Sequence, residues 1–163
     1  GKTTLLYFLT LIDDGFKGKY LFDKEDLNIL TPKKKEEFRK KNISLLLPRG
    51  NLIDFLNVGE NRSLFVDKEQ KNFDHLESNR SIHGLSGGEE ILLSLSNELS
   101  KSKKLYLLDE VTSSLSDAHA KEIMDILKEQ AKSSLVILAS HDERIMDCGK
   151  IVHIDSKESK SAS

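Results

Sequence analysis

Three short segments of the sequence carry residue types that could bind and cleave a phosphate chain. The first is Gly1-Lys2-Thr3-Thr4, which leads into apolar residues at helical spacing. A glycine that opens a helix presents backbone N–H groups and the positive end of the helix dipole to an anion. In such a loop Lys2 would reach the β- and γ-phosphates, and the Thr3 hydroxyl would hold Mg²⁺. The alternative is an ordinary helix start with threonines near its cap.

The second segment, Leu105-Tyr106-Leu107-Leu108-Asp109-Glu110, is an apolar run that ends in two carboxylates. The run predicts a buried strand with both acids at its C-terminal tip, where open α/β sheets bind ligands. Asp109 would then orient Mg²⁺ and its waters, and Glu110 would act as general base on an attacking water. A strand that ends in solvated acids is the alternative.

The third segment, Leu85-Ser86-Gly87-Gly88-Glu89, places two glycines before a helical pattern. Bare backbone N–H groups at a helix start suit an anion, and the Ser86 hydroxyl adds a donor. The same residues fit a capped helix, with Ser86 as the cap and Glu89 three residues later in the capping-box position. Taken alone, the chemistry favours neither interpretation over the other.

Alternating helix and strand patterns surround these segments. Apolar spacing predicts helices over 2–12 and 118–131, a helix after Gly88, a short strand over 19–22, buried strands over 43–47, 105–108 and 135–139, and a last short strand over 151–154. The charged stretch 33–41 predicts a solvated helix face, and the weakly periodic region 51–84 predicts a small helical insertion. We therefore expect one α/β domain over 1–163, with a core of 1–48 and 89–155 around a mostly parallel sheet flanked by helices, a helical subdomain over about 49–88 and a frayed polar tail over 156–163.

Composition narrows the possible partners. The chain has 163 residues, of which 37% are hydrophobic and 32% charged, as in globular proteins, and its net charge of -2 gives no global attraction to nucleic acid. We therefore expect no nucleic-acid partner. Cys148 is the single cysteine and cannot form an internal disulfide. No apolar run approaches the length needed to cross a bilayer, so a membrane path would have to come from another chain.

In chain order, the sequence resembles the ATP-binding cassette (ABC) ATPases. It carries GKTT, LSGGE, LYLLDE, the stretch 113–117 and Ser140-His141-Asp142, and the intervals from Glu89 to Asp109 and from Asp109 to His141 match the family's spacing without a gap. The stretch 20–53 is similar to the lipoprotein-release, macrolide and bacteriocin-export subgroup. The resemblance implies a P-loop NTPase fold. It also leads us to expect that the chain begins inside its own phosphate-binding loop and that the family's N-terminal antiparallel subdomain is missing.

The resemblance implies a role for each matching residue. Asp109 and Thr3 would hold Mg²⁺, Glu110 would be the catalytic base, and His141 would be the switch histidine that bonds the γ-phosphate and senses hydrolysis. A polar residue at a strand end is the plainer interpretation of His141. The residues expected to bind ATP are Gly1, Lys2, Thr3 and Thr4 in one copy and Ser86, Gly87, Gly88 and Glu89 facing the ATP of a second copy. The other histidines, His75, His83, His119 and His153, match no metal-ligand spacing.

The function implied is that of the ATP-binding, ATP-hydrolysing subunit of an ABC transporter. It would pair with a second copy or a related cassette, drive a separate transmembrane permease, and lie in the cytoplasm on the inner face of the membrane. One alternative is a truncated or degenerate cassette without hydrolytic activity. A cassette of chromosome maintenance, DNA repair or translation is disfavoured. Those relatives carry a long coiled coil or a second cassette, and this sequence shows neither pattern.

Several residues depart from the family pattern. Pro48 stands where the family has a glutamine that couples Mg²⁺ and water to the membrane subunit, and proline offers neither a side-chain amide nor an N–H. Ser116 stands where an aspartate is usual, with Asp117 next to it, and Val111 replaces a proline. Glu90, Ile91 and Leu92 replace the glutamine and arginine that often follow the signature. We expect weak coupling or slow turnover from these changes, and poor hydrolysis by any chain that starts at Gly1.

Overall fold

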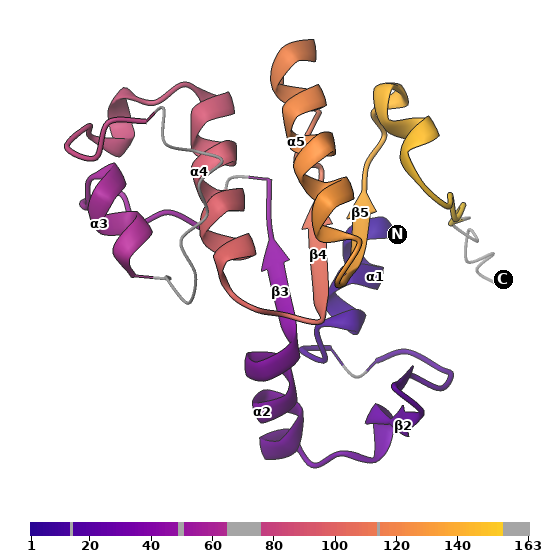
Figure 1. The fold of residues 1–163 in the computed structure, drawn as a ribbon. Helices are drawn as coiled ribbons and strands as arrows, with labels where there is room; N and C mark the ends of the chain where they lie inside the picture. The colour runs from indigo at the N-terminus through magenta and orange to yellow at the C-terminus, as the bar shows by residue number, and fades with distance from the viewer. Residues whose placement is uncertain (14, 49–50, 65–75, 114, 155–163) are drawn as a thin grey trace, which may run out of the picture.

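The computed structural model describes residues 1–13, 15–48, 51–64, 76–113 and 115–154 (Figure 1). The helices are α1 (Lys2–Leu9), α2 (Pro32–Asn42), α3 (Val58–Ser63), α4 (Gly87–Ser100) and α5 (Asp117–Gln130), and the strands are β1 (Leu21–Phe22), β2 (Glu25–Asp26), β3 (Ile43–Leu46), β4 (Leu105–Asp109) and β5 (Leu135–Ala139). Short 3-10 helices cover Leu27–Ile29, Ile82–Gly84 and Glu143–Cys148. The predicted polar tail and His75 lie outside the described residues.

The main sheet is parallel, with the strand order β3-β4-β5. Ile43 is in register with Leu105, and Asp109 is in register with Ala139. Helix α4 lies between β3 and β4 along the chain, and α5 lies between β4 and β5. The expected α/β architecture is therefore present, and the carboxyl ends of all three strands meet at one edge of the sheet.

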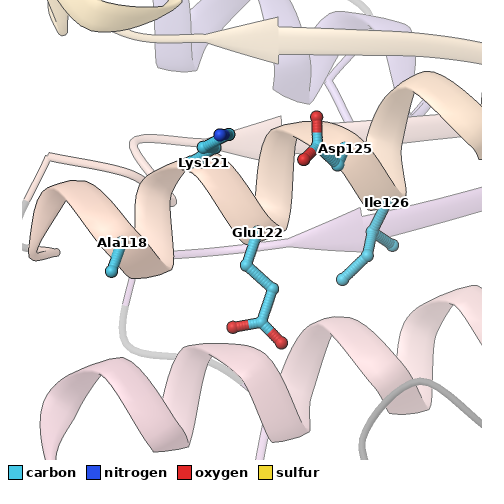
Figure 2. Close-up of a pocket in the computed structure, with 5 residues that line it drawn as sticks. All are labelled: Ala118, Lys121, Glu122, Asp125 and Ile126. Atoms are coloured by element: carbon cyan, nitrogen blue, oxygen red, sulfur yellow. The ribbon is translucent and has the colours of Figure 1, made fainter.

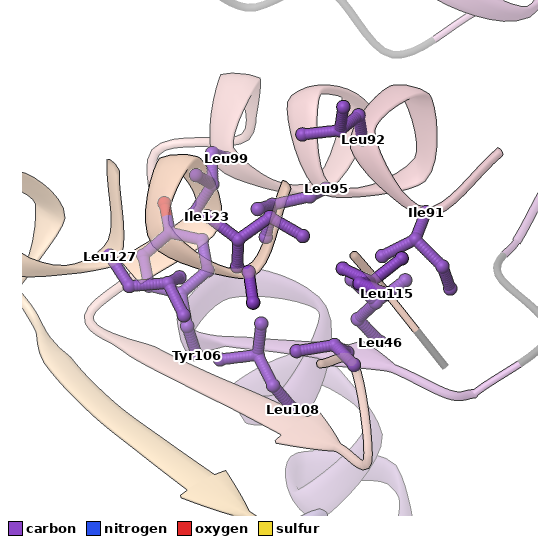
Figure 3. Close-up of a cluster of buried hydrophobic side chains, with 12 residues drawn as sticks. Leu46, Ile91, Leu92, Leu95, Leu99, Tyr106, Leu108, Leu115, Ile123 and Leu127 are labelled. Carbon is purple, nitrogen blue, oxygen red and sulfur yellow. The ribbon is translucent and has the colours of Figure 1, made fainter. Parts of the chain in front are cut away.

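Alternate residues of β4 enter two different cores. Tyr106 and Leu108 belong to a cluster with α4 and α5 on one face (Figure 3), whose other fully or nearly fully buried members include Leu46, Ile91, Leu92, Leu95, Leu99, Ile123 and Leu127. Leu105 and Leu107 pack on the other face, against Leu6 of α1. Burial on both faces explains why the strand is a continuous apolar run. It also fixes Asp109, which follows directly, at the edge of the sheet.

The region predicted to be a helical insertion contains α3 and the 3-10 helix Ile82–Gly84. Its core is a third cluster, formed by Val58, Leu76, Ile82 and Leu85 with Leu93 of α4. Helix α3 begins with a capping box between Asn57 and Glu60. This cluster therefore packs on α4, while the boundaries predicted for the subdomain remain a prediction.

Two predicted elements near the ends of the described chain differ from the structure. The helix over 2–12 ends at Leu9, because Leu11 adopts a left-handed backbone (φ 59°) that cannot continue a right-handed helix. The strand predicted over 151–154 is wrong: these residues form no regular element, and Val152 is 71% exposed. The apolar residues of this segment indicated a strand, but no strand among the described residues pairs with the segment.

The strand β5 was predicted to be buried, yet only Ala139 of its five residues is fully buried. It lies at the edge of the described sheet, so its first residue, Leu135, is 57% exposed.

Among the described residues, no helix combines the length and the apolar character that a bilayer span requires.

Candidate functional site

The start of α1 meets the end of β4. The Thr3 hydroxyl donates a 2.8 Å hydrogen bond to Oδ2 of Asp109. Asp109 is only 3% exposed, and its other oxygen, Oδ1, has no hydrogen-bond partner among the described residues. A buried carboxylate oxygen without a partner is costly, and a cation would satisfy it.

This pair fits Mg²⁺ better than a metal held by protein ligands alone. Mg²⁺ keeps several waters and is bound through one or two carboxylates together with substrate phosphates. No cluster of three or more His, Cys, Asp or Glu side chains suited to a metal occurs in the described part of the chain. Thr3 and Asp109 therefore offer the few oxygen ligands that Mg²⁺ needs beside a phosphate.

The first turn of α1 offers an anion site beside this pair. Gly1 is the N-cap and supplies no side-chain cap, and the first intrahelical bond runs from the Leu5 amide to the Gly1 carbonyl at 3.0 Å. The amides of Lys2, Thr3 and Thr4 therefore have no carbonyl within the helix to accept their bonds. Together with the helix dipole, they favour a phosphate at this end.

Glu110 follows Asp109 in a left-handed backbone conformation, with φ 50°. For a residue other than glycine this conformation costs about 1–2 kcal/mol. The Glu110 amide donates to the Ala139 carbonyl at 2.8 Å, so a bond to the neighbouring strand holds the turn. Strained backbone at the tip of a central strand is typical of functional sites, where the surrounding structure maintains it.

The strained turn brings the Glu110 carboxylate to Lys2 and His141. Its Oε1 lies 3.9 Å from Lys2 Nζ and 4.0 Å from His141 Nε2, and its Oε2 lies 3.4 Å from the His141 amide. Lys2 Nζ also forms a hydrogen bond with His141 Nε2. Because an ammonium group can only donate, Nε2 of His141 is the acceptor in this contact. Three segments that are distant in sequence thus converge on one point.

The diglycine segment starts α4 as a capped helix. Ser86 Oγ accepts from the Glu89 amide at 3.3 Å, and the Ser86 amide donates to Glu89 Oε2 at 2.7 Å, which completes a capping box. A methyl group on Gly88 would lie 2.7 Å from Nδ1 of His119, whereas one on Gly87 would meet no atom within 4 Å. The absence of a side chain at Gly88 thus makes room for the His119 ring of α5, whereas Gly87 faces open space.

Arg80 also holds this helix start, although no sequence pattern pointed to it. Its guanidinium donates to both carboxylate oxygens of Glu89 and to the Gly84 carbonyl. The backbone N–H of Ser86 and the Arg80 side chain together lower the pKa of Glu89 to about 2. No spacing rule connects an arginine in the insertion with the capping-box glutamate nine residues later, so only the fold reveals the pair.

The predicted site residues form two separate groups within the chain. No hydrogen bond or ion pair between described residues joins Ser86–Glu89 to Lys2, Thr3 or Asp109, and Figure 1 shows α4 and the N-terminus on different sides of β4. Of the remaining histidines in the described ranges, His83 and His153 are exposed, and His119 lies against Gly88.

Two other features contain none of the predicted site residues. A shallow pocket of about 430 Å³ lies along α5 (Figure 2) and is lined by Ala118, Lys121, Glu122, Asp125 and Ile126. Ser116, which stands at a position where the resemblance led us to expect aspartate, caps α5 by accepting from the His119 amide at 3.4 Å.

Comparison with known proteins agrees with this geometry. The family model described as ABC transporter matches residues 1–113. The macrolide export ATP-binding/permease protein MacB of Campylobacter jejuni (strain 81-176) is 28% identical over 161 residues, which cover 89% of this chain and 25% of MacB. The probable syringafactin export ATP-binding/permease protein SyfD of Pseudomonas syringae (strain B728a) is 30% identical over 163 residues, which cover 89% of this chain and 25% of SyfD. The chain thus spans about a quarter of the length of these curated relatives.

Shorter relatives and solved structures agree as well. The lipoprotein-releasing system ATP-binding protein LolD of Leptospira interrogans is 25% identical over 158 residues, covering 87% of this chain and 67% of LolD. The ATP-binding cassette MJ0796, solved as a dimer in a post-hydrolysis state with ADP and Pi, has a TM-score of 0.75 and 22% identity, covering 91% of this chain and 73% of that chain. The fold is therefore that of a P-loop NTPase cassette. The chain belongs to the ABC transporter family, as one of its ATP-binding cassettes.

Proposed function

We propose that this chain binds ATP with Mg²⁺, hydrolyses it, and thereby drives transport by a separate membrane permease. The observation that carries the proposal is the Thr3–Asp109 pair, with its buried, unpartnered Oδ1 beside an uncapped helix start. An anion site and a cation site lie side by side there, as a magnesium nucleotide requires.

In this proposal each residue has a definite task. The amides at the start of α1 bind phosphate oxygens, and Lys2 leaves Glu110 and His141 to pair with the β- and γ-phosphates. Thr3 and Asp109 hold Mg²⁺, which would neutralise the charge that develops on the phosphates. Glu110 accepts a proton from the attacking water, and its neighbour His141 donates a hydrogen bond to the γ-phosphate. His141 has 84% of its side chain exposed, so it is open to an incoming ligand.

We further infer that Ser86–Glu89 acts on a nucleotide held by a second cassette. The separation of this segment from Lys2 supports the inference, and so does the open space around Gly87. The dimeric state of MJ0796 points the same way. Several relatives are named as ATP-binding/permease proteins, which supports a permease partner and a peripheral position on the inner face of the membrane.

A cassette that binds nucleotide without hydrolysing it is the second candidate. It is favoured by Pro48 and Ser116: Pro48 follows β3 at an exposed position and lacks an amide group, and Ser116 is used as a helix cap. Hydrolysis itself distinguishes the two candidates.

The test is Mg²⁺-dependent ATPase activity of the protein, with Glu110→Gln as the decisive variant and Glu122→Gln as the control. Glu110→Gln should reduce kcat by about 100-fold or more, because it removes the base, and should leave nucleotide binding intact. Glu122→Gln, at a half-buried position in the pocket along α5 and outside the predicted site, should change neither quantity. Binding without hydrolysis in the unmodified protein would favour the second candidate. Absence of nucleotide binding would overturn the proposal.

A further inference from the structure

Arg144 uses every donor of its guanidinium to join two loops that follow neighbouring strands. Nε and one Nη donate to the two carboxylate oxygens of Asp142, both at 2.8 Å. That same Nη donates to the Thr112 carbonyl at 2.9 Å. The other Nη donates to the Leu115 carbonyl at 3.0 Å and to Asp117 Oδ1 at 2.7 Å. All five N–H groups are thus engaged, which a planar guanidinium allows and an ammonium does not.

The two loops are those that carry Glu110 and His141. The loop over 111–116 begins directly after Glu110 and leads into α5, whereas Asp142 directly follows His141 after β5. The Asp142 side chain is 5% exposed and that of Arg144 is 35% exposed, so the carboxylate side of this pair is shielded from solvent. Arg144 also holds the pKa of Asp142 at about 2, which keeps this carboxylate charged at any working pH.

The direct contacts between Glu110 and His141 are weak by comparison. The His141 amide lies 3.4 Å from Glu110 Oε2, and the side chains approach only to 4.0 Å. Such long contacts cannot by themselves fix the separation of the two side chains. The bonds of Arg144 are shorter, more numerous and mostly charge-assisted, and they tie together the backbones on which both side chains stand.

We propose that Arg144 is a positioning residue, which holds the turn at His141 against the loop after Glu110 and so sets the distance between these two side chains. This deepens the proposed function and rests on it for the catalytic consequence. The tether itself is a property of the folded chain and does not depend on nucleotide.

The experiment compares Arg144→Lys and Arg144→Met with the unmodified protein, and uses the exposed neighbour Glu143→Gln as the control. Three quantities are measured: kcat and KM for ATP, the ring ¹⁵N chemical shifts of His141 without nucleotide, and the thermal midpoint. In both Arg144 variants we expect kcat to fall about tenfold or more, KM to stay within about twofold, and the His141 ring signals to shift or broaden. Glu143→Gln should match the unmodified protein in all three.

Unchanged His141 signals in both Arg144 variants would overturn the proposal, and so would a fall in activity that appears only as a higher KM. Full activity of Arg144→Lys would also overturn it, because that variant keeps the charge and loses the fork of donors. If Arg144→Met fails to fold, Arg144→Lys decides. If the unmodified protein hydrolyses no ATP, the proposed function fails on that result alone, and the His141 signals still confirm or refute the tether.

Discussion

Thr3 and Asp109 lie 106 residues apart in sequence, yet their side chains are joined by a hydrogen bond of 2.8 Å. The bond exists because α1 packs on the face of β4 that carries Leu105 and Leu107, through Leu6. That packing places the open start of the helix over the carboxyl end of the strand. A hydroxyl, a buried carboxylate and the amides of the first helical turn then lie close together.

Replacing Asp109 by Asn tests the magnesium part of this arrangement. The change keeps the size of the side chain and removes the negative charge that a divalent cation needs. We expect the affinity for ATP with Mg²⁺ to fall about tenfold, or about 1.4 kcal/mol, while the affinity for ATP in EDTA stays nearly unchanged. Calorimetric titration under both conditions measures this. Asp125→Asn, an exposed site on α5, is the control, and an equal loss with and without Mg²⁺ would contradict the assignment.

The two glycines before α4 should respond differently to alanine. Gly88→Ala places a methyl group 2.7 Å from His119 Nδ1, so the His119 ring or the helix that carries it must shift, and we expect a loss of about 1–3 kcal/mol in the free energy of unfolding. Gly87→Ala meets no neighbouring atom and should leave stability unchanged. Under the proposal that Ser86–Glu89 acts on the nucleotide of a second cassette, it should nevertheless slow hydrolysis. Urea unfolding and ATPase assays separate the two effects. Gly88→Ala combined with His119→Ala should recover stability, and a failure to recover would argue against the contact.

The start of α4 should become more sensitive to acid when Arg80 is removed. The Ser86 amide and Arg80 hold the pKa of Glu89 at about 2, below its ordinary value of 4.5. A depressed carboxyl pKa stabilises the fold above the ordinary value, and this contribution disappears as pH falls from about 4.5 through about 2. In Arg80→Gln the pKa of Glu89 should rise, so the loss should occur at a higher pH.

Carboxyl ¹³C NMR of Glu89 and a far-UV circular dichroism titration between pH 6 and pH 2 measure this change. Because the Ser86 amide remains, only part of the depression should vanish. The exposed Lys121→Gln removes a positive charge from α5 and serves as the control. An identical Glu89 titration in Arg80→Gln and in the unmodified protein would show that the ion pair has no influence.

Glu98 should matter far more for stability than an exposed glutamate in a similar pair. It is 5% exposed and accepts hydrogen bonds from the Ser44 hydroxyl, from Asn51 at 3.1 Å and from Lys101 at 2.6 Å. Glu98→Ala leaves the buried Ser44 hydroxyl without this acceptor, and we expect a cost of about 2–3 kcal/mol.

The control is Glu129→Ala, which removes a pair with Lys132 whose side chains are about 70% exposed. Such a surface pair contributes about 0–1 kcal/mol. Denaturant unfolding of both variants provides the comparison, and equal losses would show that burial of Glu98 does not set its importance.

Much of the fold could be predicted because its signals are local. The first four residues of β4 form an apolar run since both faces of the strand are covered. The spacing of Ser86 and Glu89 predicts a capping box because the bonds involved span three residues. The strand over 151–154 was mispredicted for the complementary reason. Its apolar residues favour burial in a sheet. A strand forms there only if a neighbouring strand is available to pair with it, and that depends on the rest of the fold.

The candidate site was named residue by residue from its motifs, and the structure adds how its parts are held. Lys2, Glu110 and His141 each stand next to a recognisable pattern, whereas Arg80 and Arg144 stand in none. Their partners are backbone carbonyls and carboxylates up to 32 residues away, which no periodicity encodes.

The sequence by itself determined the elements of this protein and the residue types at their ends, because hydrophobic periodicity, caps and turn residues act over a few positions. Only the tertiary structure decided that Glu110 adopts a left-handed backbone, that Gly88 must remain small and that Arg144 joins two loops. Those features depend on which surfaces pack together. Packing sums many weak contacts between segments that are distant along the chain, and no short stretch of sequence contains that sum.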